Sequence, residues 1–307
     1  MSRYVVTGAA GFVGSHLTET LLAAGHDVVA VDSFTDYYDP AEKERNAAGF
    51  AVQRLDLAVG ELDLRGVDGI FHLAGRPGVR SFGGVFESYL RDNLLATQRV
   101  FEQAATAGVR VVFASSSSVY GDAETYPTPE DAHALPVSPY GLTKLGCEHL
   151  ARVYARGDGG LDAVVLRYFT VYGPRQRPDM FMRRVCDRLG DGGTFELYGD
   201  GEQSRSFTYV GDAVAANVAA MERAAPGSLY NVGGGEEATI NDAIARLERI
   251  AGRALDVRRI EAARGDVVRT KADVSRIGDE LGWRPTTTLD EGLAAMWAWA
   301  SGTVAAA

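Results

Sequence analysis

The sequence has 307 residues, of which 46% are apolar, so it is long enough for one large domain or two smaller ones with a sizeable core. Its formal net charge of −10 argues against nucleic acid as a general partner, and no apolar run is long enough to span a membrane. The first strand begins by Tyr4, which leaves no room for a signal peptide, and Cys147 and Cys186 have no CxxC spacing. These features favour a cytoplasmic location and no metal site.

A dinucleotide-binding turn opens the chain. An apolar strand is followed by GAAGFVG, which supplies Gly8, Gly11 and Gly14, and then by a helical pattern. Glycines at this spacing allow a tight turn and let a pyrophosphate approach the start of a helix. The next strand ends at Asp32, roughly 20 residues further on, where a carboxylate can bind the adenine ribose and repel a 2′-phosphate. The pattern predicts NAD as the cofactor, in preference to NADP.

Strands and helices continue to alternate beyond this point. Further strands are expected at residues 50–56, 69–75, 109–117 and 161–169, with a helix over about 81–107. Such alternation implies right-handed crossovers and a parallel sheet, which is a Rossmann-type, doubly wound α/β fold. In this topology the site lies at the carboxyl ends of the strands, where Ser116, Tyr140 and Tyr168 fall.

Tyr140 and Lys144 form a YxxxK pair on a predicted helix. Side chains four residues apart lie on one face of a helix, and a cation beside a phenol favours the phenolate. The tyrosine can then act as a base near neutral pH, and the lysine can also donate to a cofactor ribose. An isolated YxxxK is usually a surface pair. Beside a dinucleotide-binding turn, it predicts hydride chemistry on an alcohol.

After Tyr172 the alternation stops. Gly173 and Pro174 precede a basic loop that contains Arg175 and Arg177. A strand is then expected at 194–201, helices near 240–251 and 290–300, and a strand near 255–260.

The chain as a whole resembles the extended short-chain dehydrogenase/reductase family, in its branch of nucleotide-sugar epimerases, dehydratases and decarboxylases. Within that branch it is most similar to the UDP-glucuronate 4-epimerases. The matching segments are DSFTDYYDPAEK, AGRPGVR, SSSSVYG, RYFTVYGPRQRPDM, GDGEQSRSFTYVGD, YNVGGG and LGWRPTTTLDEGL. The most specific is FTVYGP followed by RPDM.

The resemblance implies a domain organisation and an assembly. Residues 1–172, with about 206–232, would form the NAD-binding Rossmann domain. About 173–205 and 233–307 would form a smaller, discontinuous α/β domain that binds the nucleotide sugar. Relatives often form homodimers through the YxxxK helix and the helix before it.

The resemblance also assigns roles to individual residues. Ser116 would hydrogen-bond the substrate O4, Tyr140 would be the base and Lys144 its partner. Arg205 would contact the diphosphate and Asp266 the nucleoside, whereas Ala263 and Arg264 depart from the family pattern and leave a second phosphate contact open. The expected cofactor contacts are Gly8, Gly11, Phe12, Val13, Gly14, Asp32, Ser33, Asp56, Leu57, Leu73, Ala74, Gly75, Asn93, Ser115, Tyr140, Lys144, Tyr168 and Phe169. The expected substrate contacts are Arg80, Ser116, Ser117, Ser118, Tyr140, Thr170, Arg177, Arg205 and Asp266.

The implied reaction is C4 epimerisation of UDP-glucuronate to UDP-galacturonate, through a transient 4-keto intermediate and hydride return from NADH. Related dehydratases and decarboxylases have carboxylates where this chain has Ser117 and Ser118, so elimination is not expected. A 4-keto uronate is a β-keto acid, which loses CO2 if the bond to its carboxylate aligns with the carbonyl π system. An epimerase must therefore hold the carboxylate out of that alignment. Ser117, Ser118, Thr170 and Arg177 are the candidates for this task.

Alternatives stay open at this point. The substrate could be UDP-glucose, the enzyme could be a UDP-glucuronate decarboxylase, and the protein could be a non-catalytic NAD-binding sensor. Single residues also have plainer interpretations. Arg175 and Arg177 could form a solvated loop, Asp56 could cap a helix, and Tyr168 and Phe169 could be core aromatics. His72 is expected to be a satisfied buried histidine.

Overall fold

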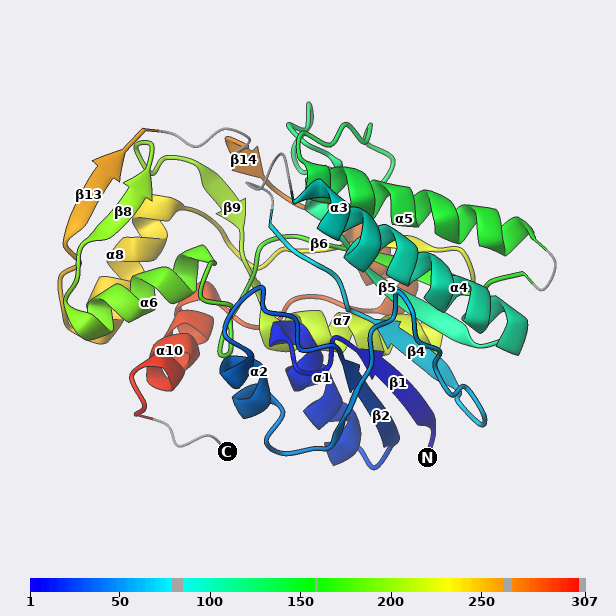
Figure 1. Ribbon diagram of the computed structural model, residues 1–307. Coiled ribbons are helices and arrows are strands. Elements are labelled where there is room, and N and C mark those ends of the chain that lie inside the picture. Colours follow the sequence, from blue (N-terminus) through cyan, green and yellow to red (C-terminus); the bar gives the residue numbers. More distant parts are fainter. Residues whose placement is uncertain (79–84, 158–159, 262–266, 304–307) are drawn as a thin grey trace.

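The computed structural model describes residues 1–307 except 79–84, 158–159, 262–266 and 304–307. Its centre is a seven-stranded sheet in which every neighbouring pair is parallel, in the order β11-β6-β5-β4-β1-β2-β3 (Figure 1). The strands are β1 (Arg3–Thr7), β2 (Asp27–Asp32), β3 (Val52–Arg54), β4 (Gly69–His72), β5 (Arg110–Ser116), β6 (Ala163–Tyr168) and β11 (Leu229–Val232). The Rossmann-type doubly wound sheet predicted from the alternation is confirmed.

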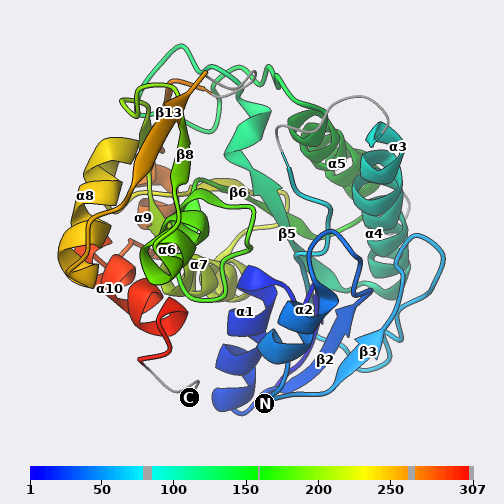
Figure 2. The same ribbon diagram turned by 60° about the vertical axis from the view of Figure 1, so that its left-hand side comes forward.

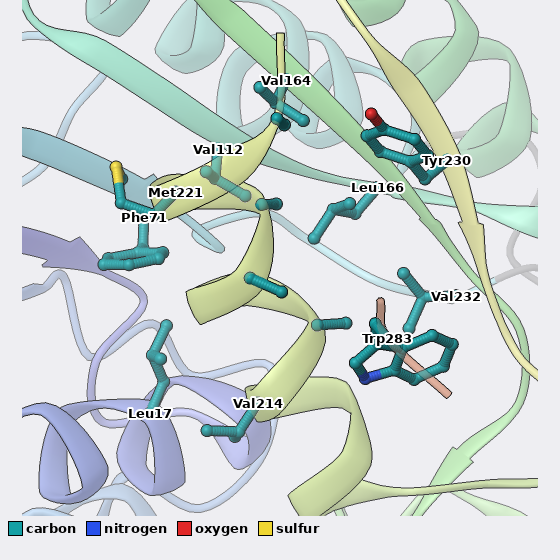
Figure 3. Packing of buried hydrophobic residues seen from close by; sticks show 14 of the residues in the cluster. Leu17, Phe71, Val112, Val164, Leu166, Val214, Met221, Tyr230, Val232 and Trp283 are labelled. Atoms are coloured by element: carbon teal, nitrogen blue, oxygen red, sulfur yellow. The ribbon is translucent and has the colours of Figure 1, made fainter. Parts of the chain in front are cut away.

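Helices cover both faces of this sheet. Helices α1 (Phe12–Ala23) and α7 (Val210–Arg223) pack on one face, and α4 (Ala96–Ala107) and α5 (Pro139–Arg156) pack on the other. Successive residues of a strand point to opposite faces, so neighbours such as Ile70 and Phe71 join different apolar clusters. Figure 3 shows the first cluster, where side chains of α1 and α7 surround Phe71 and its neighbours.

The helix predicted over 81–107 is divided in the described part of the chain. It consists of α3 (Phe86–Tyr89), a π-helical turn η1 (Leu90–Leu95) and α4. A π turn holds an extra residue and is frequent at functional sites. Here it turns Asn93 inward, and that side chain is only 1% exposed.

A smaller lobe stands beside the sheet and comes forward in Figure 2. A parallel strand pair packs against three helices around an apolar core that includes Leu197, Leu247 and Leu293. These elements are α6 (Phe181–Asp191), β8 (Phe195–Tyr198), α8 (Ile240–Ala251), β13 (Val257–Ile260) and α10 (Leu289–Ala300). Short strands adjoin them: β9 (Ser204–Ser206), β12 (Glu237–Thr239) and β14 (Arg269–Thr270) form one sheet, and β7 (Val171–Tyr172) pairs with β10 (Thr208–Tyr209).

One segment of the C-terminal part returns to the large sheet. In α9 (Ser275–Leu281) and just beyond it, Ile277, Leu281 and Trp283 join the apolar cluster of α7. The indole of Trp283 donates to the carbonyl of Asp212 at 3.0 Å, and the Asp212 carboxylate accepts from the backbone N–H groups of Thr286 and Thr287 at 3.1 Å. This segment thus packs on the core of the large sheet, although the expected boundary gave all of 233–307 to the smaller domain.

Helix α2 (Pro40–Asn46) was not predicted. Asp39 caps it by accepting from the N–H of Ala41 at 2.9 Å, and Pro40 occupies its first turn. The Asp-Pro pair was the available signal. Among the described residues, no helix combines the length and the apolar character needed to cross a membrane.

Candidate active site

A cavity of about 520 Å³ opens at the carboxyl ends of β1, β2, β4 and β5, and we call it the cofactor cavity. Its floor is the glycine turn. A Cβ on Gly8 would lie 2.9 Å from the backbone N of Ala74, and a Cβ on Gly14 would lie 2.1 Å from the carbonyl oxygen of Gly8. Helix α1 begins after Gly11, which offers no side-chain cap, so its first N–H groups face the cavity as an anion site. The turn therefore fits a dinucleotide pyrophosphate.

Asp32 lies at the end of β2 and lines the same cavity. Its carboxylate accepts from the N–H of Ala10 at 3.1 Å and of Phe34 at 2.8 Å, which fixes its orientation and leaves acceptor capacity for ribose hydroxyls. Sequence reasoning missed Lys43, a buried cation of α2 that also lines the cavity. Its ammonium donates to the carbonyl of Thr35 at 2.9 Å, and burial lowers its pKa.

Most residues predicted to contact NAD line the cofactor cavity. They are Gly8, Gly11, Phe12, Val13, Gly14, Asp32, Ser33, Asp56, Leu57, Leu73, Ala74, Gly75, Ser115, Tyr140, Lys144 and Tyr168. Phe169 lines the neighbouring cavity instead.

Asn93 lies behind the cavity wall. Its amide accepts from the N–H of Arg76 at 2.6 Å and donates to Thr143 Oγ1 at 3.0 Å. Its side chain therefore braces the loop after β4 against α5, and the expected contact with the cofactor stays a prediction.

The YxxxK pair stands at the start of α5. Ser138 caps this helix by accepting from the N–H of Gly141 at 3.1 Å. Tyr140 borders both cavities, whereas Lys144 lines only the cofactor cavity. The Lys144 ammonium donates to the carbonyl of Ala114 at 2.8 Å and lies 6.0 Å from the centroid of the Tyr140 ring. The lysine therefore lies near the phenol ring without a direct hydrogen bond to its hydroxyl.

Ser116 ends β5 and caps a short 3-10 helix, η2 (Ser117–Val119). Its Oγ accepts from the N–H of Ser118 and donates to Ser118 Oγ, both at 3.1 Å. Ser116 and Tyr140 line the second cavity together. The predicted trio of Ser116, Tyr140 and Lys144 is thus assembled where the two cavities meet.

A buried ion pair supports this trio, and sequence reasoning missed it. Glu148 continues the helical stripe of Tyr140 and Lys144 by a further turn, and its side chain is 1% exposed. It accepts from Ser115 Oγ at 2.5 Å and from two nitrogens of Arg167 at 2.9 and 2.7 Å. One carboxylate therefore ties α5 to the ends of β5 and β6. Since the Ser115 hydroxyl donates its hydrogen to Glu148, it can only accept from a cofactor.

The second cavity has a volume of about 570 Å³ and lies between the sheet and the smaller lobe. The predicted substrate contacts that line it are Ser116, Ser117, Ser118, Tyr140, Thr170, Arg177 and Arg205. Arg80 and Asp266 lie outside the described residues, as do Ala263 and Arg264.

Arg177 borders both cavities, so its side chain does not simply face water, as the interpretation of a solvated loop would require. Its Nε and Nη2 bind the two carboxylate oxygens of Asp179 at 3.0 and 3.1 Å. This bidentate partner was not foreseen, and it reduces the net positive charge that Arg177 presents.

His72 is a structural residue, as expected. Its ring nitrogens bond Thr7 Oγ1 at 2.7 Å and Thr97 Oγ1 at 3.0 Å. Complete burial, aided by the nearby charge of Lys144, lowers its pKa to about 3, so the ring is neutral at physiological pH.

Comparisons with known proteins agree with this geometry. A family model, the NAD dependent epimerase/dehydratase family, matches residues 4–233. YtcB of Bacillus subtilis, an uncharacterized UDP-glucose epimerase, is 39% identical over 303 residues, which are 95% of each chain. The UDP-glucuronate 4-epimerase of Thermodesulfobacterium geofontis is 34% identical over 307 aligned residues, which cover 95% of this chain and 94% of the relative.

A solved structure gives the same result. The UDP-glucuronic acid 4-epimerase of Bacillus cereus, in complex with UDP-glucuronic acid and NAD, has a TM-score of 0.94 at 37% identity, covering 98% of this chain and 100% of that one. The chain therefore belongs to the NAD dependent epimerase/dehydratase family.

Proposed function

We propose that this protein is an NAD-dependent UDP-sugar 4-epimerase that interconverts UDP-glucuronate and UDP-galacturonate. One observation carries the proposal: Tyr140 borders both cavities, with Lys144 on the cofactor side and Ser116 on the other. A base in this position can reach a sugar hydroxyl while the sugar carbon faces the cofactor.

NAD, when bound, supplies the acceptor and the donor of the C4 hydride. The other steps fall to the protein. Tyr140 takes the O4 proton and returns it, with Lys144 one helical turn away on the same face of α5. The Ser116 hydroxyl orients O4, and its bonds to Ser118 hold it in place. Because the redox cycle closes on itself, the cofactor is not consumed.

The choice of a uronate rests on the second cavity. Ser117, Ser118 and Thr170 line it with hydroxyls, and Arg177 adds a guanidinium. These groups suit a carboxylate, and neither serine can perform the acid/base step of an elimination. The names of the Thermodesulfobacterium and Bacillus cereus proteins support this substrate. The name of YtcB favours UDP-glucose, which remains the second candidate.

The direct test is incubation of the purified protein with UDP-glucuronate, UDP-galacturonate and UDP-glucose, with products followed by NMR. We expect the two uronates to interconvert with little loss of CO2. Tyr140→Phe is the matched control, because it keeps the ring and removes the titrating oxygen. Faster conversion of UDP-glucose would favour the second candidate, and a UDP-pentose as main product would indicate a decarboxylase. Bound NAD without turnover of any sugar would indicate a sensor.

We also propose a division into two domains. The NAD-binding domain would hold residues 1–172 and about 206–232, together with α9 and Trp283, which pack on its core. The nucleotide-sugar-binding domain would hold about 173–205 and the rest of 233–307. Limited proteolysis with and without NAD and UDP-glucuronate would test this division, since a ligand between the domains should protect the segments that join them.

A homodimer through α4 and α5 is a further part of the proposal. Leu142 and Val153 are exposed and eleven residues apart on α5, which places them on one face of the helix. Leu90 and Leu95, on the neighbouring π turn, are also exposed. Light scattering should report a dimer. Val153→Glu should dissociate it, whereas the exposed control Val59→Glu should leave the dimer intact.

The buried free thiols Cys147 and Cys186 suit the expected cytoplasmic location.

A further inference from the structure

Three loops from distant parts of the chain meet between the cofactor cavity and the second cavity. They follow β2, β4 and β7, and they bring Tyr37, Arg76 and the Arg177–Asp179 pair together. Tyr37 and Arg177 border both cavities, Arg76 borders the cofactor cavity and Asp179 borders the second one.

The Tyr37 ring is the centre of this junction. Its hydroxyl donates to a carboxylate oxygen of Asp179 at 3.2 Å. The guanidinium carbon of Arg76 lies 5.3 Å from the ring centroid, and that of Arg177 lies 5.9 Å away. Both distances fall within the range of cation–π attraction. Burial, with a contribution from Asp179, raises the pKa of Tyr37 to about 12, so the hydroxyl keeps its proton and remains a donor.

Further contacts hold each part of the junction in place. Arg76 lies 3.7 Å from Asp92, and its backbone is held by Asn93, the residue that the π turn directs inward. Asp179 holds Arg177 through two hydrogen bonds. The loop that carries Tyr37 runs into α2, whose Lys43 bonds back to Thr35. The three loops can therefore separate only if the contacts of Tyr37 break.

We propose that Tyr37, Arg76, Arg177 and Asp179 form a latch that slows the exchange of NAD. The latch rests on the proposed function, because a reaction that regenerates its cofactor gains from retaining it. NAD enters and leaves only while the three loops are apart, so both rate constants scale with the fraction of protein in which the latch is open. The latch thus sets how fast NAD exchanges, separately from how tightly it binds.

The test measures NAD exchange in the absence of any UDP-sugar. Holoprotein is mixed with an excess of an enzyme that consumes free NAD, and release is followed over time. Association is measured by adding NAD to protein that has been stripped of it. Tyr37→Phe removes one hydrogen bond to a carboxylate and should speed release by about 10-fold to 100-fold. Tyr37→Ala also removes the ring and its cation–π contacts, and should speed release by about another 2-fold to 5-fold. Association should accelerate in parallel, so that Kd changes much less than either rate constant.

Tyr154→Phe is the matched control, because that hydroxyl also has a hydrogen-bond partner, Gln98, but lies on α5 away from both cavities. It should leave both rate constants unchanged. An increase in Kd equal to the increase in release rate, with association unchanged, would make Tyr37 an ordinary cofactor contact and overturn the latch. Unchanged release in both Tyr37 variants would overturn it as well. Because no sugar is present, these outcomes do not depend on whether UDP-glucuronate is the substrate.

Discussion

The two cavities are built in different ways. The cofactor cavity rests on the ends of adjacent parallel strands, and its floor is backbone, with glycines at the positions where a Cβ would collide. The second cavity is lined by apolar, charged and hydroxyl side chains that come from the sheet and from separate segments of the smaller lobe. A cofactor site of the first kind is fixed by the fold, whereas a substrate site of the second kind depends on how the lobe packs. Substitutions at the cofactor cavity and at the second cavity should therefore affect different measured quantities.

The largest effect is expected where the two cavities meet. Tyr140→Phe should lower turnover by at least about 100-fold, the usual scale for loss of a general base, while the fold and bound NAD are retained. Turnover by NMR and the NAD content of the purified variant would check this. Near-normal turnover would assign the base to another residue.

Loss of the buried ion pair between Glu148 and Arg167 should have the next largest effect, on stability. Glu148→Gln leaves Arg167 buried without its counter-charge and should cost about 3–5 kcal/mol in the free energy of unfolding. Urea titration measures it. The control is Glu44→Gln, which removes an exposed pair with Arg54 and should cost at most about 1 kcal/mol. Equal costs for the two variants would contradict a supporting role of Glu148.

On the substrate side, Arg177→Ala should weaken use of UDP-glucuronate by about one to two decades, the scale of one charged hydrogen bond, and affect any use of UDP-glucose much less. It also leaves Asp179 without its cationic partner, with only the hydrogen bond from Tyr37, so release of CO2 from the keto intermediate is a second readout. Asp179→Asn separates the two contributions, because it keeps Arg177 and removes the competing carboxylate. Equal losses with both sugars would assign Arg177 to structure alone.

The smallest effect concerns pH. The pKa of His72 falls from 6.5 to about 3 on folding, so its contribution to stability is complete above pH 6.5 and is lost as the pH falls toward 3. At pH 5.5, protonation of His72 in the unfolded state should lower the free energy of unfolding by about 1.4 kcal/mol relative to its value at high pH. His72→Asn does not titrate, so its stability should fall less between pH 7.5 and 5.5. The control is the exposed His133→Asn, which should behave as the wild type does.

The sequence predicted the sheet side well, because its signals are local. The strands expected at 69–75 and 109–117 contain β4 and β5, and the glycine turn and Asp32 line one cavity as expected. A separation of four residues on a helix also suffices to place Tyr140 and Lys144 on one face.

Contacts between loops could not be predicted in this way. The partnership of Tyr37 with Asp179 joins residues 142 positions apart, and no periodic pattern encodes it. The π turn that buries Asn93 has no sequence signal of its own, and the cofactor contact expected of Asn93 stays a prediction. The assigned chemical roles, including those of Arg80 and Asp266, remain predictions.

The return of α9 to the large sheet has a consequence for how such an enzyme changes its specificity. The chain leaves the large sheet after β6, comes back at α7 and β11, leaves again for α8, and returns once more with Trp283 before α10. The smaller lobe consequently has no single pair of ends at which it could be excised and replaced. A new substrate preference therefore cannot be acquired by exchanging one continuous segment. It has to arise from substitutions in several segments of the smaller lobe, which alternate along the chain with segments of the large sheet.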